Sequence, residues 1–167
     1  MEKICRYSVL FGGLIVSVVV ALFAQSCTGT TRSAKTANSL YNTGTHYYNG
    51  KKYPDAFRLF REAADAGSAD AMNFIGLMYE KGQATDTNYQ QAMEWYQKAA
   101  HAGSTAAISN IGWMYDKGKG VSEDDQQAIE WYQKAANAGN ADAAYNMGWM
   151  YHYGEGVDTN YQKAMEW

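Results

Sequence analysis

The chain has 167 residues, a net charge of −3, a single proline and 47% hydrophobic residues. This mild acidity argues against nonspecific nucleic-acid binding, which requires clustered Lys and Arg. Cys5 and Cys27 are the two cysteines, too few for a disulfide framework.

The first 26 residues have the features of a secretory signal. Lys3 and Arg6 form a short basic region, and an apolar run follows over residues 9–24. The run is shorter than the roughly 20 residues that span a bilayer comfortably. It ends at the small-x-small sequence Ala24-Gln25-Ser26. We therefore predict export, with the signal peptide over residues 1–26.

Cys27 directly follows this signal, in the segment FAQSC. The segment resembles a bacterial lipobox, which implies that Cys27 is lipidated and that the protein is a membrane-anchored lipoprotein of the cell envelope. The alternatives are a soluble periplasmic or secreted product and an uncleaved membrane anchor. Residues 27–38 are polar apart from alanine and Cys27 and are predicted to form a flexible tether.

The rest of the chain repeats one pattern. Gly76, Gly112 and Gly148 lie 36 residues apart, and the residues around them recur with them. A period of this size indicates a solenoid, in which each unit packs only against its neighbours. The predicted solenoid covers residues 39–167, with units at about 39–70, 71–106, 107–142 and 143–167. The last unit is incomplete, since nothing follows Trp167, the counterpart of Trp131. We expect a fragment or a truncated product.

Each unit is predicted to contain two helices. In the second unit, Ser68 caps a helix over 69–81 that ends at Gly82, and Asn88 caps a helix over 89–102. No segment alternates with period two, so no strands are expected. The predicted fold is therefore all-α, a solenoid of helical hairpins. The same cap and stop signals recur at Ser104, Gly118, Asp124, Gly139, Asn140, Gly154 and Asn160.

A recurring glycine inside the first helix predicts close helix packing. Gly76 costs about 1 kcal/mol there relative to Ala, so its recurrence requires a compensating gain. We expect Tyr96 or Trp95 of the second helix to lie against it. The apolar stripes predicted to face each other are Ala92, Tyr96 and Ala99 on the second helix, and Met72, Ile75 and Tyr79 on the first.

These residues also carry a family resemblance. The pattern A-x-x-x-[IM]-G-x-M-Y-x-x-G, followed by A-x-x-W-Y-x-K-A-A-x-A-G, resembles the SEL-one-like repeat family across residues 71–167. That resemblance implies an α/α solenoid related to tetratricopeptide repeats. A disulfide-rich branch of the family is associated with β-lactam binding, but this chain lacks the cysteine pair of each repeat.

The histidine and glutamate residues that could bind a metal or act in catalysis are not grouped in the sequence. His46, His101 and His152 occupy different repeat positions, so no metal site is predicted. Glu94 and Glu130 occupy the same position of successive hairpins and should not face each other as an acid–base pair. The sequence therefore predicts a non-enzyme without a cofactor.

The residues that vary between units on the first helix are predicted to line a concave groove. Positions that differ between units while the surrounding repeat positions stay the same, several of them aromatic, are typical of an interface. For Trp113 and Trp149 the alternative is packing against the next hairpin. The predicted groove residues are Tyr41, Tyr48, Asn73, Leu77, Lys81, Ser109, Trp113, Asp116, Lys117, Tyr145, Trp149, His152 and Tyr153.

The function predicted from the sequence is an envelope-anchored scaffold that binds a protein or a peptide along this groove. One alternative is an envelope enzyme acting on cell-wall material or β-lactams. The other is a periplasmic regulator of a membrane signalling protein.

Overall fold

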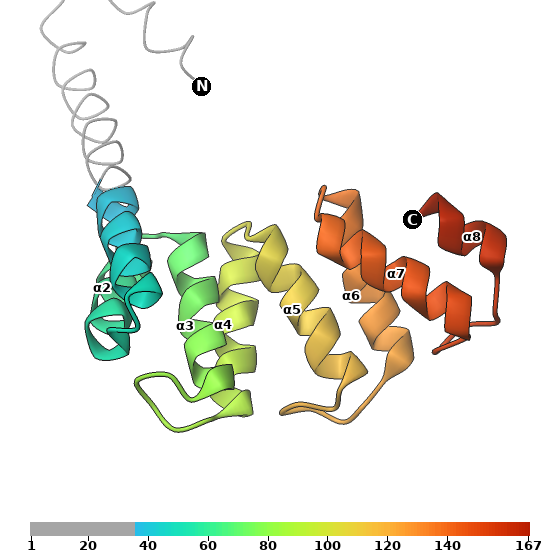
Figure 1. Ribbon diagram of the computed structural model, residues 1–167, viewed down its shortest axis with the longest axis horizontal. Helices are drawn as coiled ribbons and strands as arrows, with labels where there is room; N and C mark the ends of the chain where they lie inside the picture. The colour runs from blue at the N-terminus through green and yellow to red at the C-terminus, as the bar shows by residue number, and fades with distance from the viewer. Residues whose placement is uncertain (1–35) are drawn as a thin grey trace, which may run out of the picture.

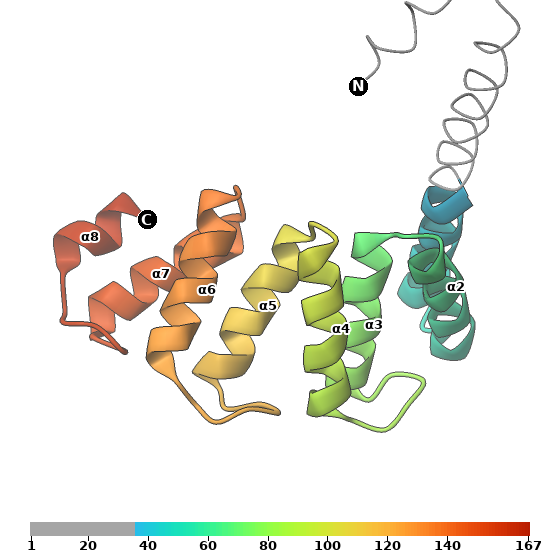
Figure 2. The ribbon, with the colours of Figure 1, turned by 180° about the vertical axis from the view of Figure 1, so that it is seen from behind.

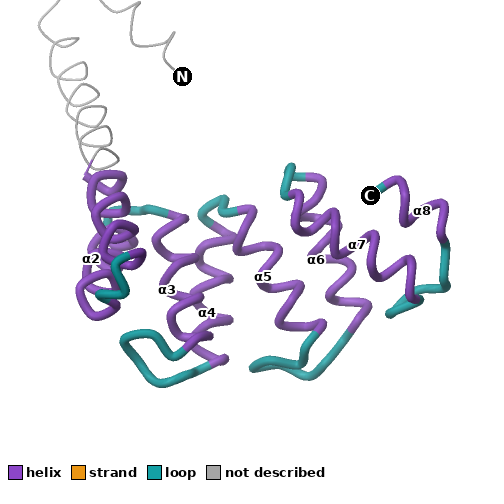
Figure 3. The backbone as a smooth tube through the Cα atoms, in the orientation of Figure 1, coloured by secondary structure: helices purple, strands orange, loops and turns teal. Residues whose placement is uncertain are grey.

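The computed structural model describes residues 36–167, which form helices joined by turns and loops without strands (Figure 3). The predicted signal, Cys27 and tether residues 28–35 lie outside the described residues. No helix in the described part is long and apolar enough to cross a membrane. A first helix covers residues 36–49. The others are α2 (Tyr53–Asp65), α3 (Ala69–Lys81), α4 (Tyr89–His101), α5 (Thr105–Asp116), α6 (Asp125–Asn137), α7 (Ala141–Tyr153) and α8 (Tyr161–Glu166).

The helices stack side by side in chain order as antiparallel hairpins (Figure 1). The same order is seen from behind in Figure 2, where α6 lies in front of α7. The hairpins pair the 36–49 helix with α2, α3 with α4, α5 with α6, and α7 with α8. The last hairpin is short, since α8 has 6 residues where α4 and α6 have 13 each. This arrangement confirms the predicted α/α solenoid.

Side-chain caps start the helices where the sequence predicts them. The Ser68 hydroxyl accepts a hydrogen bond from the Ala71 amide at 3.2 Å, and five further caps follow the same geometry. Each such cap is worth about 1 kcal/mol. At the other end, Gly82 closes α3 in the left-handed conformation, with φ of 64°. The remaining caps are Asn88, Ser104, Asp124, Asn140 and Asn160.

The predicted close approach at the helix glycines is confirmed, with Tyr96 rather than Trp95 as the partner. A Cβ added to Gly76 would lie 2.6 Å from Tyr96 Cδ1, and one added to Gly112 would lie 2.8 Å from Tyr132 Cδ1. These distances are far shorter than van der Waals contact, so only glycine fits beneath the rings. Trp95 instead packs with residues of α2 and α3.

The core is a series of clusters rather than one centre. Ala92, Tyr96 and Ala99 of α4 are fully buried together with residues of α5. On α3 the buried centre is Ala71, Ile75 and Met78. Met72 and Tyr79 of the predicted stripe are half-buried and pack against the cluster that contains Ala92, Tyr96 and Ala99. The predicted facing of the two stripes is therefore confirmed, while the most deeply buried line of α3 runs through Ala71, Ile75 and Met78.

Backbone contacts also join each loop to its hairpin and to the preceding unit. The Asn88 amide donates to the Tyr79 carbonyl at 2.9 Å, and the equivalent bonds recur in the next two units. The loop residue Gly120 has a φ of 73°, and a Cβ there would lie 2.8 Å from the Tyr89 carbonyl carbon. Ala84 occupies this loop position in the second unit, with a φ of 67°. Left-handed backbone costs alanine roughly 1–2 kcal/mol, so this loop carries local strain.

We predict that Gly112→Leu destabilises the array because the new side chain must displace the Tyr132 ring. Overpacking of a well-packed contact costs about 1–3 kcal/mol. Gln97→Leu, at an exposed position of α4, adds the same side chain without this clash. The urea midpoint should fall clearly for Gly112→Leu and stay close to wild type for Gln97→Leu. Equal midpoints for the two variants would contradict the close-approach argument.

Candidate partner-binding surface

The predicted groove residues of the first unit face the core. The Tyr41 ring lies 5.8 Å from Phe74 and 6.0 Å from Phe60, measured between ring centroids. Tyr48 lies 5.4 Å from Phe74 and 5.5 Å from Tyr53. Both tyrosines are half-buried, and burial raises the pKa of each phenol. These rings therefore contribute mainly to packing.

The middle units present a mixed surface. The Asn110 amide donates to the Asn73 side-chain oxygen at 2.9 Å, which links α3 to α5. Ser109 is buried, with 7% of its surface exposed, and Leu77 is half-buried. Trp113 is half-buried and packs against both the α4–α5 cluster and the α6–α7 cluster. The Trp113 side chain therefore contributes to packing between the hairpins.

A phenol–carboxylate pair recurs between the helices of the two middle hairpins. The Tyr96 hydroxyl donates to Glu80 Oε2 at 2.6 Å, and the Tyr132 hydroxyl donates to Asp116 Oδ2 at 3.4 Å. Burial, reinforced by the nearby carboxylate, raises the pKa of both phenols. Asp116 also accepts a hydrogen bond from Lys117 Nζ at 3.0 Å, which raises the pKa of that lysine.

Another charged residue of the predicted groove, Lys81, is exposed at the end of α3. Together with the partly exposed Asp116–Lys117 pair, it leaves the middle of the surface polar.

The predicted groove residues on α7 form an exposed aromatic row. Tyr145, Trp149 and Tyr153 are 68%, 46% and 56% exposed. Their ring centroids are 6.4 Å apart between the first two and 4.4 Å apart between the last two. His152 lies against this row, 4.6 Å from the Tyr153 ring and 5.2 Å from Tyr161 of α8. The structure therefore gathers the four predicted residues of the last unit into one accessible patch.

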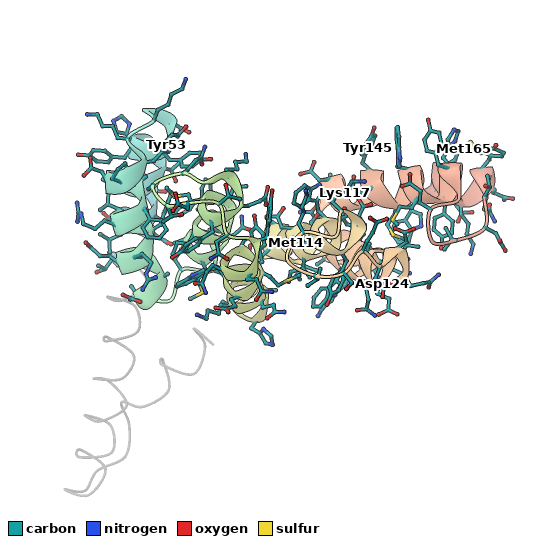
Figure 4. All side chains as sticks on the ribbon, turned by 90° about the horizontal axis from the view of Figure 1, so that it is seen from below. Tyr53, Met114, Lys117, Asp124, Tyr145 and Met165 are labelled. Carbon is teal, nitrogen blue, oxygen red and sulfur yellow. The ribbon has the colours of Figure 1, made fainter. Side chains whose placement is uncertain are left out.

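The sequence reasoning missed the contribution of α8 to this patch. Tyr161, Met165 and Trp167 are exposed and, with α7, line a groove of about 730 Å³. Tyr145 and Met165 project from the same side of the array (Figure 4). The repeat register carried a signal for this, since Met165 is the counterpart of Met93 and Ile129, which are buried in their own units. The groove lining also includes the small residues Ala141, Ala144, Gly148 and Ala164.

Comparison with known families identifies the repeat. The Sel1 repeat model matches residues 37–68, 69–104, 105–140 and 141–167. The chain therefore belongs to the Sel1-repeat family, which confirms the resemblance to SEL-one-like repeats. Proteins with these repeats are generally scaffolds for protein–protein interaction, and the fold is typically non-enzymatic.

The solved structures similar to this chain include two with TM-scores of 0.70 and 0.68. A Sel1 repeat protein from Oxalobacter formigenes is 38% identical with a TM-score of 0.70, over 76% of this chain and 52% of that one. The protein c5321, a protective antigen present in uropathogenic Escherichia coli strains, displays an SLR fold. It is 30% identical with a TM-score of 0.68, over 78% of this chain and 30% of its own. The chain thus spans about half or less of these relatives. A search of curated proteins found no match.

We predict that Tyr96→Phe lowers the free energy of unfolding by about 1 kcal/mol at neutral pH, because the hydrogen bond to Glu80 is lost. The folded state holds the pKa of Tyr96 above its usual value of about 10. The stabilisation is therefore fully present below pH 10 and declines as pH rises further, because only the unfolded phenol ionises. One such group contributes a slope of about 1.4 kcal/mol per pH unit.

Urea titrations between pH 7 and pH 11 test this linkage. Tyr96→Phe should lose stability less steeply than wild type above pH 10. Tyr145→Phe, which changes an exposed phenol, should follow wild type throughout. If the free energy of unfolding fell equally steeply with pH for Tyr96→Phe and wild type above about pH 10, the linkage to the Tyr96 phenol would be refuted.

Proposed function

We propose that this chain is a protein-binding scaffold that captures a protein or peptide on the side of the array formed by the first helices, with α7 as its main anchor. The observation that carries this proposal is the exposed row Tyr145, Trp149 and Tyr153. Large exposed aromatic residues in a contiguous patch are characteristic of binding surfaces, since isolated folds rarely expose them together.

The polar residues of the neighbouring units fit the rim of such a surface. Lys81 and Lys117 are exposed on α3 and just beyond α5, while Asn73 and Asn110 present amide groups between these helices. Polar groups around an apolar anchor set the orientation of a partner and contribute less to affinity. The family assignment supports the same function, because Sel1-repeat proteins are generally interaction scaffolds.

We predict that Trp149→Ala weakens partner capture, whereas Trp113→Ala lowers the stability of the array. Trp149 is nearly half exposed, so its loss should reduce partner capture by about 2 kcal/mol or more, roughly thirtyfold, with little change in the thermal midpoint. Trp113 packs against two core clusters, so its loss should lower stability by about 2–4 kcal/mol. The measurements are quantitative pull-down from an envelope extract of the source cell and thermal unfolding by circular dichroism.

His101→Ala is the control, because His101 is exposed at the end of α4 and is not one of the predicted groove residues. Its capture and midpoint should equal those of wild type. If Trp149→Ala stays folded and captures the same proteins in the same amounts, the partner uses another surface.

The proposed scaffold is exported and held at a membrane of the cell envelope through lipidated Cys27. The support is the basic start, the short apolar run and the lipobox-like segment that ends at Cys27. A single acyl chain binds membranes only marginally, whereas several hold a protein stably, at about 0.8 kcal/mol per buried CH₂. The polar residues that follow Cys27 would let the array reach a partner away from the bilayer.

Cys27→Ser should release the protein from the membrane fraction into the soluble fraction, because no lipid can be attached. Ser33→Ala, in the tether, serves as the control and should fractionate like wild type. An unmodified Cys27 in the mass spectrum of the wild-type protein would exclude the lipid anchor.

A further inference from the structure

Long loops join the two helices of the second, third and fourth hairpins, and those of the second and third lie along one edge of the array (Figure 1). In the third hairpin, Gly120 is half-buried against the preceding unit, and Val121 packs on the α4–α5 cluster. In the fourth hairpin, Gly156 and Val157 occupy the same positions, and Val157 packs on the α6–α7 cluster. A glycine and a valine therefore hold each of these two loops against the array.

A glutamine of the preceding unit also binds each of these loops. Gln90 Nε2 donates to the Gly120 carbonyl at 3.4 Å, and Gln126 Nε2 donates to the Gly156 carbonyl. Gln90 lies in the first turn of α4, and Gln126 lies in the first turn of α6. The start of each of these second helices is therefore bonded to the loop of the next hairpin.

The loop over residues 82–88, which joins α3 to α4, differs at all three positions. Ala84, Thr85 and Pro54 stand one period before the glycine, the valine and the glutamine of the third hairpin. Proline has no side-chain amide, so Pro54 cannot donate the hydrogen bond that the glutamine makes. Ala84 is exposed, whereas the two glycines are half-buried. The 82–88 loop is therefore held less firmly against the preceding unit.

The closed 82–88 loop also contains unfavourable features that its opening would relieve. Ala84 has a φ of 67°, in the left-handed region, which is far less favourable for alanine than for glycine. The Thr85 hydroxyl and the Gln83 side-chain oxygen are buried, and neither has a hydrogen-bond partner within the part of the chain that the structure describes. A buried polar group without a partner is unfavourable, and water can bond to it once the loop opens.

We propose that the 82–88 loop is a strap that opens locally while α3 and α4 stay folded, and that its opening uncovers Tyr48. In the closed loop, the Gln83 side chain is hydrogen-bonded to the Tyr48 phenol. Segments with few buried apolar contacts open at a lower free energy than the helices around them. Tyr48 is a predicted groove residue, so its release adds a phenol to the partner-binding surface. This consequence rests on the proposed function, whereas the opening itself does not.

Amide hydrogen exchange of the full chain, followed for single residues by NMR, tests the opening. The Asn88 amide donates to the Tyr79 carbonyl at 2.9 Å, and the Asp124 amide donates to the Tyr115 carbonyl at 3.0 Å. These two amides therefore report on equivalent positions of two loops. The protection factor of Asn88 should be lower than that of Asp124 by roughly tenfold or more. Equal protection of Asn88 and Asp124, or of Asn88 and the Tyr96 amide within α4, would overturn the inference.

The triple variant Pro54→Gln, Ala84→Gly and Thr85→Val gives the loop the residues of the third hairpin. It should raise the protection factor of Asn88 by roughly tenfold and leave that of Asp124 unchanged. Circular dichroism checks that the helices are intact. A folded triple variant with unchanged protection of Asn88 would show that these three positions do not control the opening, and the inference would fail.

The reverse change in the third hairpin is the matched control. Gln90→Ala combined with Val121→Thr removes the glutamine bond and places a hydroxyl where the valine packs. The protection factor of Asp124 should fall, while that of Asn88 should stay at the wild-type value. An unchanged Asp124 would mean that these side chains do not hold the loop, which is incompatible with the strap.

Nitration by tetranitromethane, located by mass spectrometry, tests whether the opening uncovers Tyr48. Tyr48 should react more slowly in the triple variant than in wild type, while Tyr145, which is 68% exposed, should react equally in both. Equal nitration of Tyr48 in the two proteins would refute its uncovering. Partner capture through Trp149 is measured separately, so its absence would reject the proposed function without changing the exchange result.

Discussion

In each of the first three hairpins, an aromatic ring of the second helix lies directly on a glycine of the first. The Phe60 ring lies on Gly44, the Tyr96 ring on Gly76 and the Tyr132 ring on Gly112, at distances that exclude any Cβ. A glycine inside a helix costs about 1 kcal/mol, and close packing of a large buried ring offsets that cost. The contact sets the separation of the two helices, and the flanking alanines are buried as a result.

The hairpins stack because a single hairpin leaves apolar side chains exposed. The outer face of each hairpin is apolar, so it is stabilised when the next first helix docks on it. The three core clusters each join residues of successive units. Loop backbones add to this coupling where Gly120 and Gly156 lie against Tyr89 and Asp125 of the preceding unit. Stability of such an array is a sum of local terms, so a change in one unit acts mainly on that unit and its neighbours.

The same architecture separates packing positions from positions available for binding. Leu77, Trp113 and Trp149 share one repeat position, yet they differ in environment. Leu77 is half-buried, Trp113 is held between two clusters, and Trp149 is nearly half exposed within an aromatic row. Residue type therefore does not decide the role of this position. What decides it is whether a neighbouring helix covers the side chain, and on α7 the described structure leaves it accessible.

The sequence by itself determined the helical period, the caps, the hairpin loops and the glycine contact, because these depend on residues that are close in the chain or repeat at a fixed interval. Only the tertiary structure decided that Tyr96 rather than Trp95 lies on Gly76, and that Met78 is among the fully buried residues of α3. It also placed Tyr41 and Tyr48 against Phe74, and joined Met165 to the α7 row. The physical reason is that burial in a solenoid is set by helices on both sides. The rotation of each helix between its neighbours is a property of the packed array, which a repeat pattern alone does not contain.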